Sequence, residues 1–112
     1  MNMNALKEII SDLVDKEKTS AIKNHGYAHS DHEALALLQE EIWEAETEMQ
    51  RVRIYGHSLK KQVYTNNDDL ALEHICEIKN NAIKATCELI QVAAMCDKFI
   101  ESREVREYDE SE

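Results

Sequence analysis

The chain has 112 residues, of which 43% are hydrophobic and 32% charged, so it suffices for one compact domain and is too short for two. It contains no proline, two glycines and 5% aromatic residues, a composition that disfavours β-sheets and favours an all-α fold with long helices. A formal net charge of -10 disfavours nucleic acid polymers and anionic membranes as partners and favours metal ions.

The first two helices are predicted from apolar periodicity and from their end signals. Apolar side chains recur at helical spacing over residues 5–23, which predicts the first helix. Ser30 followed three residues later by Glu33 is a capping box, which predicts the start of the second. This helix is expected to end at about Tyr55, because Gly56 is a stop signal.

The remainder of the chain is predicted to hold a linker, a third helix and a tail. Residues 57–67 are polar and are interpreted as the linker. Asp68 is the expected N-cap of a third helix that continues to about Ser102. We therefore expect a single domain over residues 1–100, followed by a charged tail, 101–112, that frays.

The second and third predicted helices each carry an apolar seam with spacings that alternate between three and four residues. The seam residues are Leu35, Leu38, Ile42, Ala45, Met49 and Val52 in the second helix, and Ile75, Ile78, Ala82, Ala85, Leu89, Val92, Cys96 and Phe99 in the third. Seams of this length need several partners, so we expect an antiparallel helical bundle completed by homo-oligomerisation, as a homodimer or homotetramer.

Polar residues form a second stripe beside each seam. Residues 29–50 contain acids but no Lys or Arg, and Glu41, Glu44 and Glu48 share one face of the helix. The corresponding stripe of the third helix comprises His74, Glu77, Asn81, Lys84, Glu88, Gln91, Met95 and Lys98. In an antiparallel pair both stripes face one groove, with Glu44 opposite Glu88, Glu41 near Gln91 and Glu48 near Lys84.

Carboxylates gathered in such a groove repel one another and raise at least one pKa unless a cation is bound. Magnesium takes oxygen ligands, keeps several waters and is commonly shared between a few carboxylates and substrate phosphates. A helical groove with three or four acids therefore suits a magnesium site. The alternative is that these glutamates only form a solvated helix face, since glutamate is a good helix former.

Two motifs in this region resemble those of a known superfamily. The stretch HSDHEALALLQEEIWE, residues 29–44, has an EExxE core and resembles the first motif of the MazG-like all-α nucleoside triphosphate pyrophosphohydrolases. The run Glu88-Leu89-Ile90-Gln91, within CELIQVAAMCDKFI, is similar to the ExxD second motif of that superfamily. The resemblance covers roughly residues 26–100.

The resemblance implies a dimeric or higher helical assembly that hydrolyses a nucleoside triphosphate to the monophosphate and pyrophosphate, as a house-cleaning enzyme of the nucleotide pool. It implies Mg²⁺ as cofactor, with Mn²⁺ as a possible substitute. Its metal ligands would be Glu41, Glu44, Glu88 and the residue at the fourth motif position, Gln91. Glu40 and Glu41 would be catalytic, with Glu40 as a further ligand or as the base for the attacking water. The candidates for phosphate contact are Lys84, Arg51, Arg53, Lys60 and Lys61.

The chain departs from the motifs at two points. Gln91 replaces the aspartate of the second motif, which exchanges a carboxylate for a neutral amide and lowers the expected metal affinity. The interval between Glu44 and Glu88 is also longer than in compact members. Either three carboxylates suffice, aided by Glu48, or the chain is a catalytically impaired helical dimer that binds a nucleotide or a protein. A metal-free coiled-coil adaptor is a third reading. Base and sugar preference stay open.

The sequence also indicates a cellular compartment. The cysteines Cys76, Cys87 and Cys96 are odd in number and lack CxxC spacing, which predicts neither a disulfide framework nor a zinc site. No apolar run approaches the roughly 20 residues of a membrane span. The first residues, MNMNALKEII, do not resemble a signal peptide. We expect a cytoplasmic protein without a membrane partner.

Overall fold

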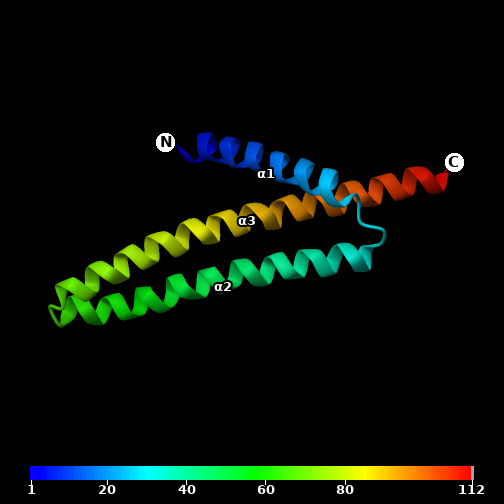
Figure 1. The fold of residues 1–112 in the computed structure, drawn as a ribbon. Coiled ribbons are helices and arrows are strands. Elements are labelled where there is room, and N and C mark those ends of the chain that lie inside the picture. The colour runs from blue at the N-terminus through cyan, green and yellow to red at the C-terminus, as the bar shows by residue number, and fades with distance from the viewer. Residues whose placement is uncertain (112) are drawn as a thin grey trace. The chain divides into compact units, whose positions relative to one another are not determined.

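The computed structural model describes residues 1–111, with side chains up to residue 110, and consists of three helices joined by short connections (Figure 1). The helices are α1 (Met3–His25), α2 (Asp31–Tyr64) and α3 (Asp68–Ser111). The described residues contain no strand, so the prediction of an all-α fold is confirmed. Within the same residues, no helix has both the length and the apolar content that a bilayer crossing requires.

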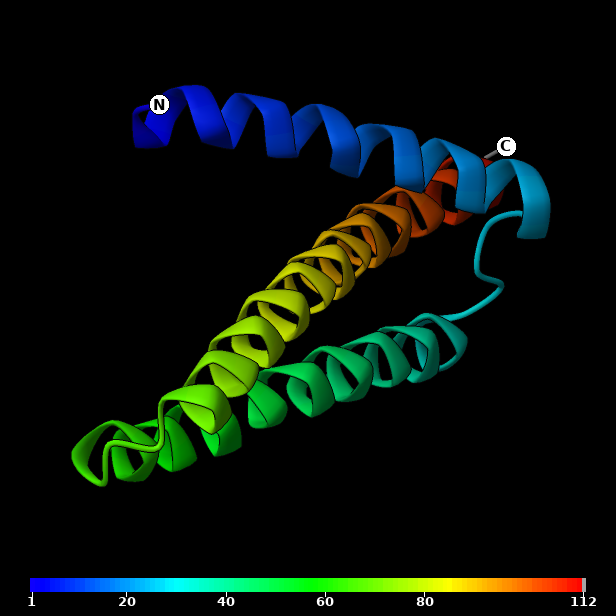
Figure 2. The same ribbon diagram turned by 60° about the vertical axis from the view of Figure 1, so that its left-hand side comes forward.

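The chain divides into two compact units, and both α2 and α3 run from one unit into the other. Unit 1 comprises Met1–Ile42 and Leu89–Glu112, and so contains α1, the beginning of α2 and the end of α3. Unit 2, Trp43–Glu88, is an antiparallel hairpin made from the rest of α2 and α3 (Figures 1 and 2). The predicted antiparallel pairing of these two helices is present within unit 2.

Side-chain caps begin both α1 and α2, and the cap predicted for α2 is present. The Asn2 side chain accepts a hydrogen bond from the Ala5 amide at 2.8 Å and begins α1 slightly earlier than expected. At the start of α2, the Glu33 amide donates to Ser30 Oγ at 3.1 Å, which confirms Ser30 as the cap. The Glu33 carboxylate reaches back and accepts from the His29 amide at 3.4 Å.

The prediction that α2 ends at Tyr55 is wrong, because Gly56 lies inside the helix and α2 continues to Tyr64. A glycine in a helix interior costs only about 1 kcal/mol relative to alanine, and packing on both sides of Gly56 outweighs that cost. Ser58 Oγ lies 2.7 Å from His74 Nε2 of α3, and the Tyr55 ring meets the same imidazole edge-on at 5.4 Å between centroids.

The polar linker predicted over residues 57–67 is therefore reduced to the turn at Thr65–Asn67. Asn66 has a φ of 57°, a left-handed conformation that Asn tolerates, and the Asn67 amide donates back to the Gln62 carbonyl at 2.9 Å. The Asn67 side chain also accepts from the Leu70 amide at 3.4 Å. The N-cap of α3 is thus Asn67 rather than the predicted Asp68, which is the first residue of the helix.

The end of α3 holds the connection between α1 and α2 in place. The Ala28 amide donates to Ser102 Oγ at 2.9 Å, and Arg106 Nη1 donates to the Ala28 carbonyl at 2.9 Å. Arg106 also pairs with Asp31 in the first turn of α2. α3 consequently does not end near Ser102, as the sequence predicts, but continues to Ser111. Fraying of the 101–112 tail stays a prediction.

Small side chains dominate the buried positions. Those buried are Val14, Ala28, Ala34, Ala45, Ala71, Ala85 and Ala94 among the apolar residues, and Asn81, Lys98 and Ser102 among the polar ones. Of the predicted seams, only Ala45 and Ala85 are fully buried, whereas bulky members such as Met49, Ile75 and Leu89 are about half exposed. Alanine at a contact lets two helices approach closely. The helices of each unit therefore touch along a narrow face of small residues, and many of their larger apolar side chains stay exposed.

Candidate metal centre

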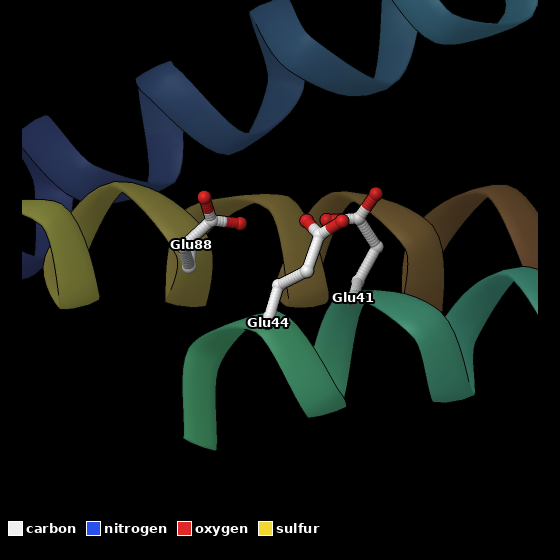
Figure 3. Close-up of side chains that lie close together, drawn as sticks. All are labelled: Glu41, Glu44 and Glu88. Atoms are coloured by element: carbon white, nitrogen blue, oxygen red, sulfur yellow. The ribbon is translucent and has the colours of Figure 1, made fainter. Parts of the chain in front are cut away.

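Three glutamates bring their carboxylates together (Figure 3). Glu41 and Glu44 project from the same side of α2, because residues three apart on a helix are neighbours. Glu88 belongs to α3 and faces Glu44 across the hairpin of unit 2. One carboxylate oxygen from each of the three lies within 4.8 Å of the others, and all three side chains are half-buried. We call these residues the acidic triad.

Glu88 shows how the carboxylates of the triad act on one another. Partial burial raises the pKa of Glu88, and a hydrogen bond with Glu44 raises it further. The negative charges of Glu44 and Glu48 act in the same direction. Retaining a proton on Glu88 is one way to relieve the repulsion, and binding a cation is the other.

Glu48 lies one turn beyond Glu44 on α2 and adds to this negative potential. Its Oε1 accepts from Arg51 Nη1 at 2.8 Å. Its Oε2 is buried and finds no hydrogen-bond partner among the described residues. A buried carboxylate oxygen without a partner is costly. The donor set of the triad, with this oxygen nearby, therefore fits a hard cation such as Mg²⁺, which takes oxygen ligands.

The fourth motif position is engaged elsewhere. Gln91 lies one turn after Glu88 on α3, and its Nε2 donates to Glu17 Oε2 of α1 at 2.8 Å. Gln91 and Glu41 line the same cavity of unit 1, in agreement with their expected proximity. The sequence did not single out Glu17, because it lies in a segment of balanced charge and has no motif spacing.

The remaining predicted site residues are more dispersed. Glu40 precedes Glu41 by about 100° of helix rotation and is exposed. Arg51 and Lys84 line one cavity of about 370 Å³ in unit 2, together with Glu77 and Asn81. The other basic candidates, Arg53, Lys60 and Lys61, are exposed. Lys60 lies over the ring of Tyr64, with Nζ 5.8 Å from its centroid, near the end of α2.

Comparisons of the chain with protein-family models, curated proteins and solved structures find no match. The site therefore has to be judged from its own geometry. That geometry is an all-α chain with an accessible acidic triad on α2 and α3.

Proposed function

We propose that the chain is a magnesium-dependent enzyme that hydrolyses a nucleoside triphosphate to the monophosphate and pyrophosphate. The acidic triad carries this proposal, because Glu41, Glu44 and Glu88 are the carboxylates that the two MazG-like motifs supply. The motifs lie far apart in the sequence, yet their acids converge.

In the proposed reaction, water attacks the α-phosphorus, the bond from that phosphorus to the bridging oxygen breaks, and pyrophosphate leaves. Mg²⁺ would neutralise the triphosphate charge and hold it in position for attack. Glu41, Glu44 and Glu88 would hold the ion through carboxylate oxygens. Glu41 or the adjacent Glu40 would accept the proton that the water loses. Lys84 and Arg51, which share a cavity, are the basic residues best placed together for phosphate contact.

The proposal is tested by incubating the protein with ordinary and modified nucleoside triphosphates and Mg²⁺ or Mn²⁺, and by assaying monophosphate and pyrophosphate. Loss of groups that only orient metal ligands costs about 10–100-fold, so Glu41→Gln and Glu88→Gln should each lower turnover by at least that factor. Glu46→Gln is the matched control, because Glu46 is an exposed acid on α2 outside the triad. Absence of turnover with every substrate and metal, in the wild type and in Gln91→Asp, would contradict the proposal.

The hydrogen bond between Gln91 and Glu17 favours a second candidate, a catalytically impaired helical module that binds a nucleotide or a protein. In this candidate the amide of Gln91 joins α3 to α1 and supplies no charge to a metal site. It predicts nucleotide binding without turnover. Turnover by the wild type separates the candidates, because the impaired module binds a nucleotide or a protein without hydrolysing a triphosphate.

A further inference from the structure

Glu48 holds a buried carboxylate oxygen that the rest of the described chain leaves without a partner. This atom is Oε2, and no hydrogen-bond donor reaches it from any described residue. Only 15% of the Glu48 side chain is exposed. Lys84, which the sequence places near Glu48, forms none of the ion pairs found among the described residues. A buried acceptor without a donor is costly, so Oε2 is where a donor from outside the polypeptide would be expected.

Glu48 lies beside the acidic triad without belonging to it. It follows Glu44 by four residues, so the two share one face of α2. Burial raises the pKa of Glu88 most, and Glu44 and the charge of Glu48 add to this effect. The mutual approach of carboxylate oxygens within 4.8 Å includes Glu41, Glu44 and Glu88 but not Glu48. Glu48 is therefore better suited to a group carried by a bound cation than to the cation itself.

A water bound to Mg²⁺ is a donor of the kind that Oε2 lacks. Mg²⁺ held by a few carboxylates keeps several of its waters, and the charge of the ion makes these waters stronger donors. Carboxylates that accept hydrogen bonds from groups on a metal are common outside the direct ligands, and they orient those groups. Arg51 leaves Oε2 available, because it binds Glu48 through Oε1, at 2.8 Å.

The fourth motif position explains why an additional negative charge matters at this site. Gln91 stands where the superfamily has an aspartate, and its amide donates to Glu17 Oε2 of α1 at 2.8 Å. A glutamine brings no charge to a cation. Glu48 brings a fourth carboxylate to the neighbourhood of Glu44 and Glu88, and all three residues belong to unit 2.

We propose that Glu48 makes up for the missing aspartate from outside the direct ligands: its Oε2 accepts a hydrogen bond from a water that the cation at the triad carries. The inference rests on the proposed function, because it concerns the cation of the same site. Glu48 acts through that water and is a positioning residue, whereas the triad holds the ion. Arg51 orients the Glu48 carboxylate through Oε1.

Mg²⁺ affinity tests the inference without any catalytic step. Mg²⁺ is titrated into the full chain without nucleotide, and binding is followed by isothermal titration calorimetry. Glu48→Met removes both the charge and the acceptor and should weaken Mg²⁺ binding about 10–100-fold, the usual effect of losing such an outer partner. Glu48→Gln keeps an acceptor oxygen and should weaken binding less. Glu46→Met, at an exposed acid on another face of α2, should leave the affinity unchanged. Wild-type affinity in Glu48→Met, or an equal loss in Glu48→Met and Glu48→Gln, would overturn the inference.

The stability of the metal-free protein is the second measurement. Glu48→Gln removes a negative charge that acts on Glu88, so the thermal midpoint in a chelator should rise at neutral pH. A lower midpoint would show that the carboxylate is satisfied within the chain, and would overturn the inference. If Glu48→Met does not fold, Glu48→Gln decides, and wild-type Mg²⁺ affinity in that variant overturns the inference.

The outcomes also separate this inference from the proposed function. The expected Mg²⁺ affinities without triphosphate hydrolysis would overturn the proposed function alone. Hydrolysis by a protein whose Mg²⁺ affinity does not depend on Glu48 would overturn only this inference. Absence of Mg²⁺ binding by the wild type would overturn both.

Discussion

Glu88 is the member of the triad whose pKa is raised by its surroundings. Its pKa is raised by partial burial, by the hydrogen bond with Glu44 and by neighbouring negative charge. A carboxyl group with a raised pKa in the folded state stabilises the fold at acidic pH, and this contribution is lost as pH rises through the folded-state pKa. Above that pKa and without a cation, ionised Glu88 therefore opposes folding. Such a trade between stability and function is common at sites built for binding.

Glu88→Gln should consequently raise the midpoint of thermal unfolding at neutral pH in the presence of a chelator, because the amide removes one charge from the triad. The same substitution should abolish stabilisation by Mg²⁺. For the wild type, Mg²⁺ at about 100 times its dissociation constant would add about 2.7 kcal/mol, equivalent to roughly 10 °C in a chain of this size. Differential scanning calorimetry at several pH values, with and without Mg²⁺, measures both effects.

Glu46→Gln is the control here too, since it removes an exposed acid from the same helix and leaves the triad intact. It should keep the Mg²⁺ response. If wild type and Glu88→Gln respond identically to Mg²⁺, the triad does not hold the ion. If the stability of the two proteins depends on pH in the same way, Glu88 does not carry the repulsion.

At the scale of the helix, the two glycines have opposite roles. Gly56 lies inside α2, where a methyl group added at its Cα would meet no atom within 4 Å, whereas Gly26 follows α1 with φ 75° and ψ -176°. Gly56→Ala should stabilise the protein by about 0.5–1 kcal/mol, because alanine loses less backbone entropy in a helix. Gly26→Ala should cost about 1–3 kcal/mol, because only glycine adopts that conformation readily. Urea unfolding of both variants measures these changes.

The pair of variants also tests whether α2 is continuous. If α2 ended near Tyr55, as the sequence predicts, Gly56 would sit at a helix C-terminus and alanine there would destabilise the protein. A loss of stability in Gly56→Ala would therefore contradict the long α2. Gly26→Ala provides the internal reference, since its backbone conformation requires glycine in either case.

Local signals and non-local packing explain which features could be predicted from the sequence. Ser30 caps α2 through a neighbouring amide, and Glu41 and Glu44 share a face through helix periodicity, so both could be predicted. The proximity of Glu44 to Glu88 could also be predicted, because it follows once the two helices are assumed to pack antiparallel. The continuation of α2 past Gly56 depends on the contact of Ser58 with His74 of α3. The residues next to Gly56 in the sequence give no sign of this contact. The burial of Lys98 likewise depends on how the helices of unit 1 pack together.

At the scale of the whole molecule, a single chain leaves many large apolar side chains exposed to solvent. Along α3, Ile75 and Leu89 lie two heptads apart on one side of the helix, and each is about half exposed. Other exposed apolar residues of α3 are Leu72, Ile83 and Ile100, and α2 exposes Leu35, Ile42, Met49 and Ile54. Contiguous exposed apolar surface commonly marks an interaction site. This observation supports the proposal that the bundle is completed by a second copy of the chain.

Self-association is therefore expected, as a homodimer or homotetramer, and light scattering coupled to size-exclusion chromatography measures it. Because unfolding is then linked to association, the thermal midpoint should rise with protein concentration. Ile75→Glu should shift the equilibrium towards the monomer, because burying a charge in a helix-to-helix contact is costly. Ile75 is half exposed in the single chain, so this substitution should disturb the packing within the chain little. Asn80→Glu, which adds the same charge at an exposed position on another side of α3, should leave the assembly unchanged. A wild-type mass of one chain, together with a midpoint independent of concentration, would refute the expected assembly.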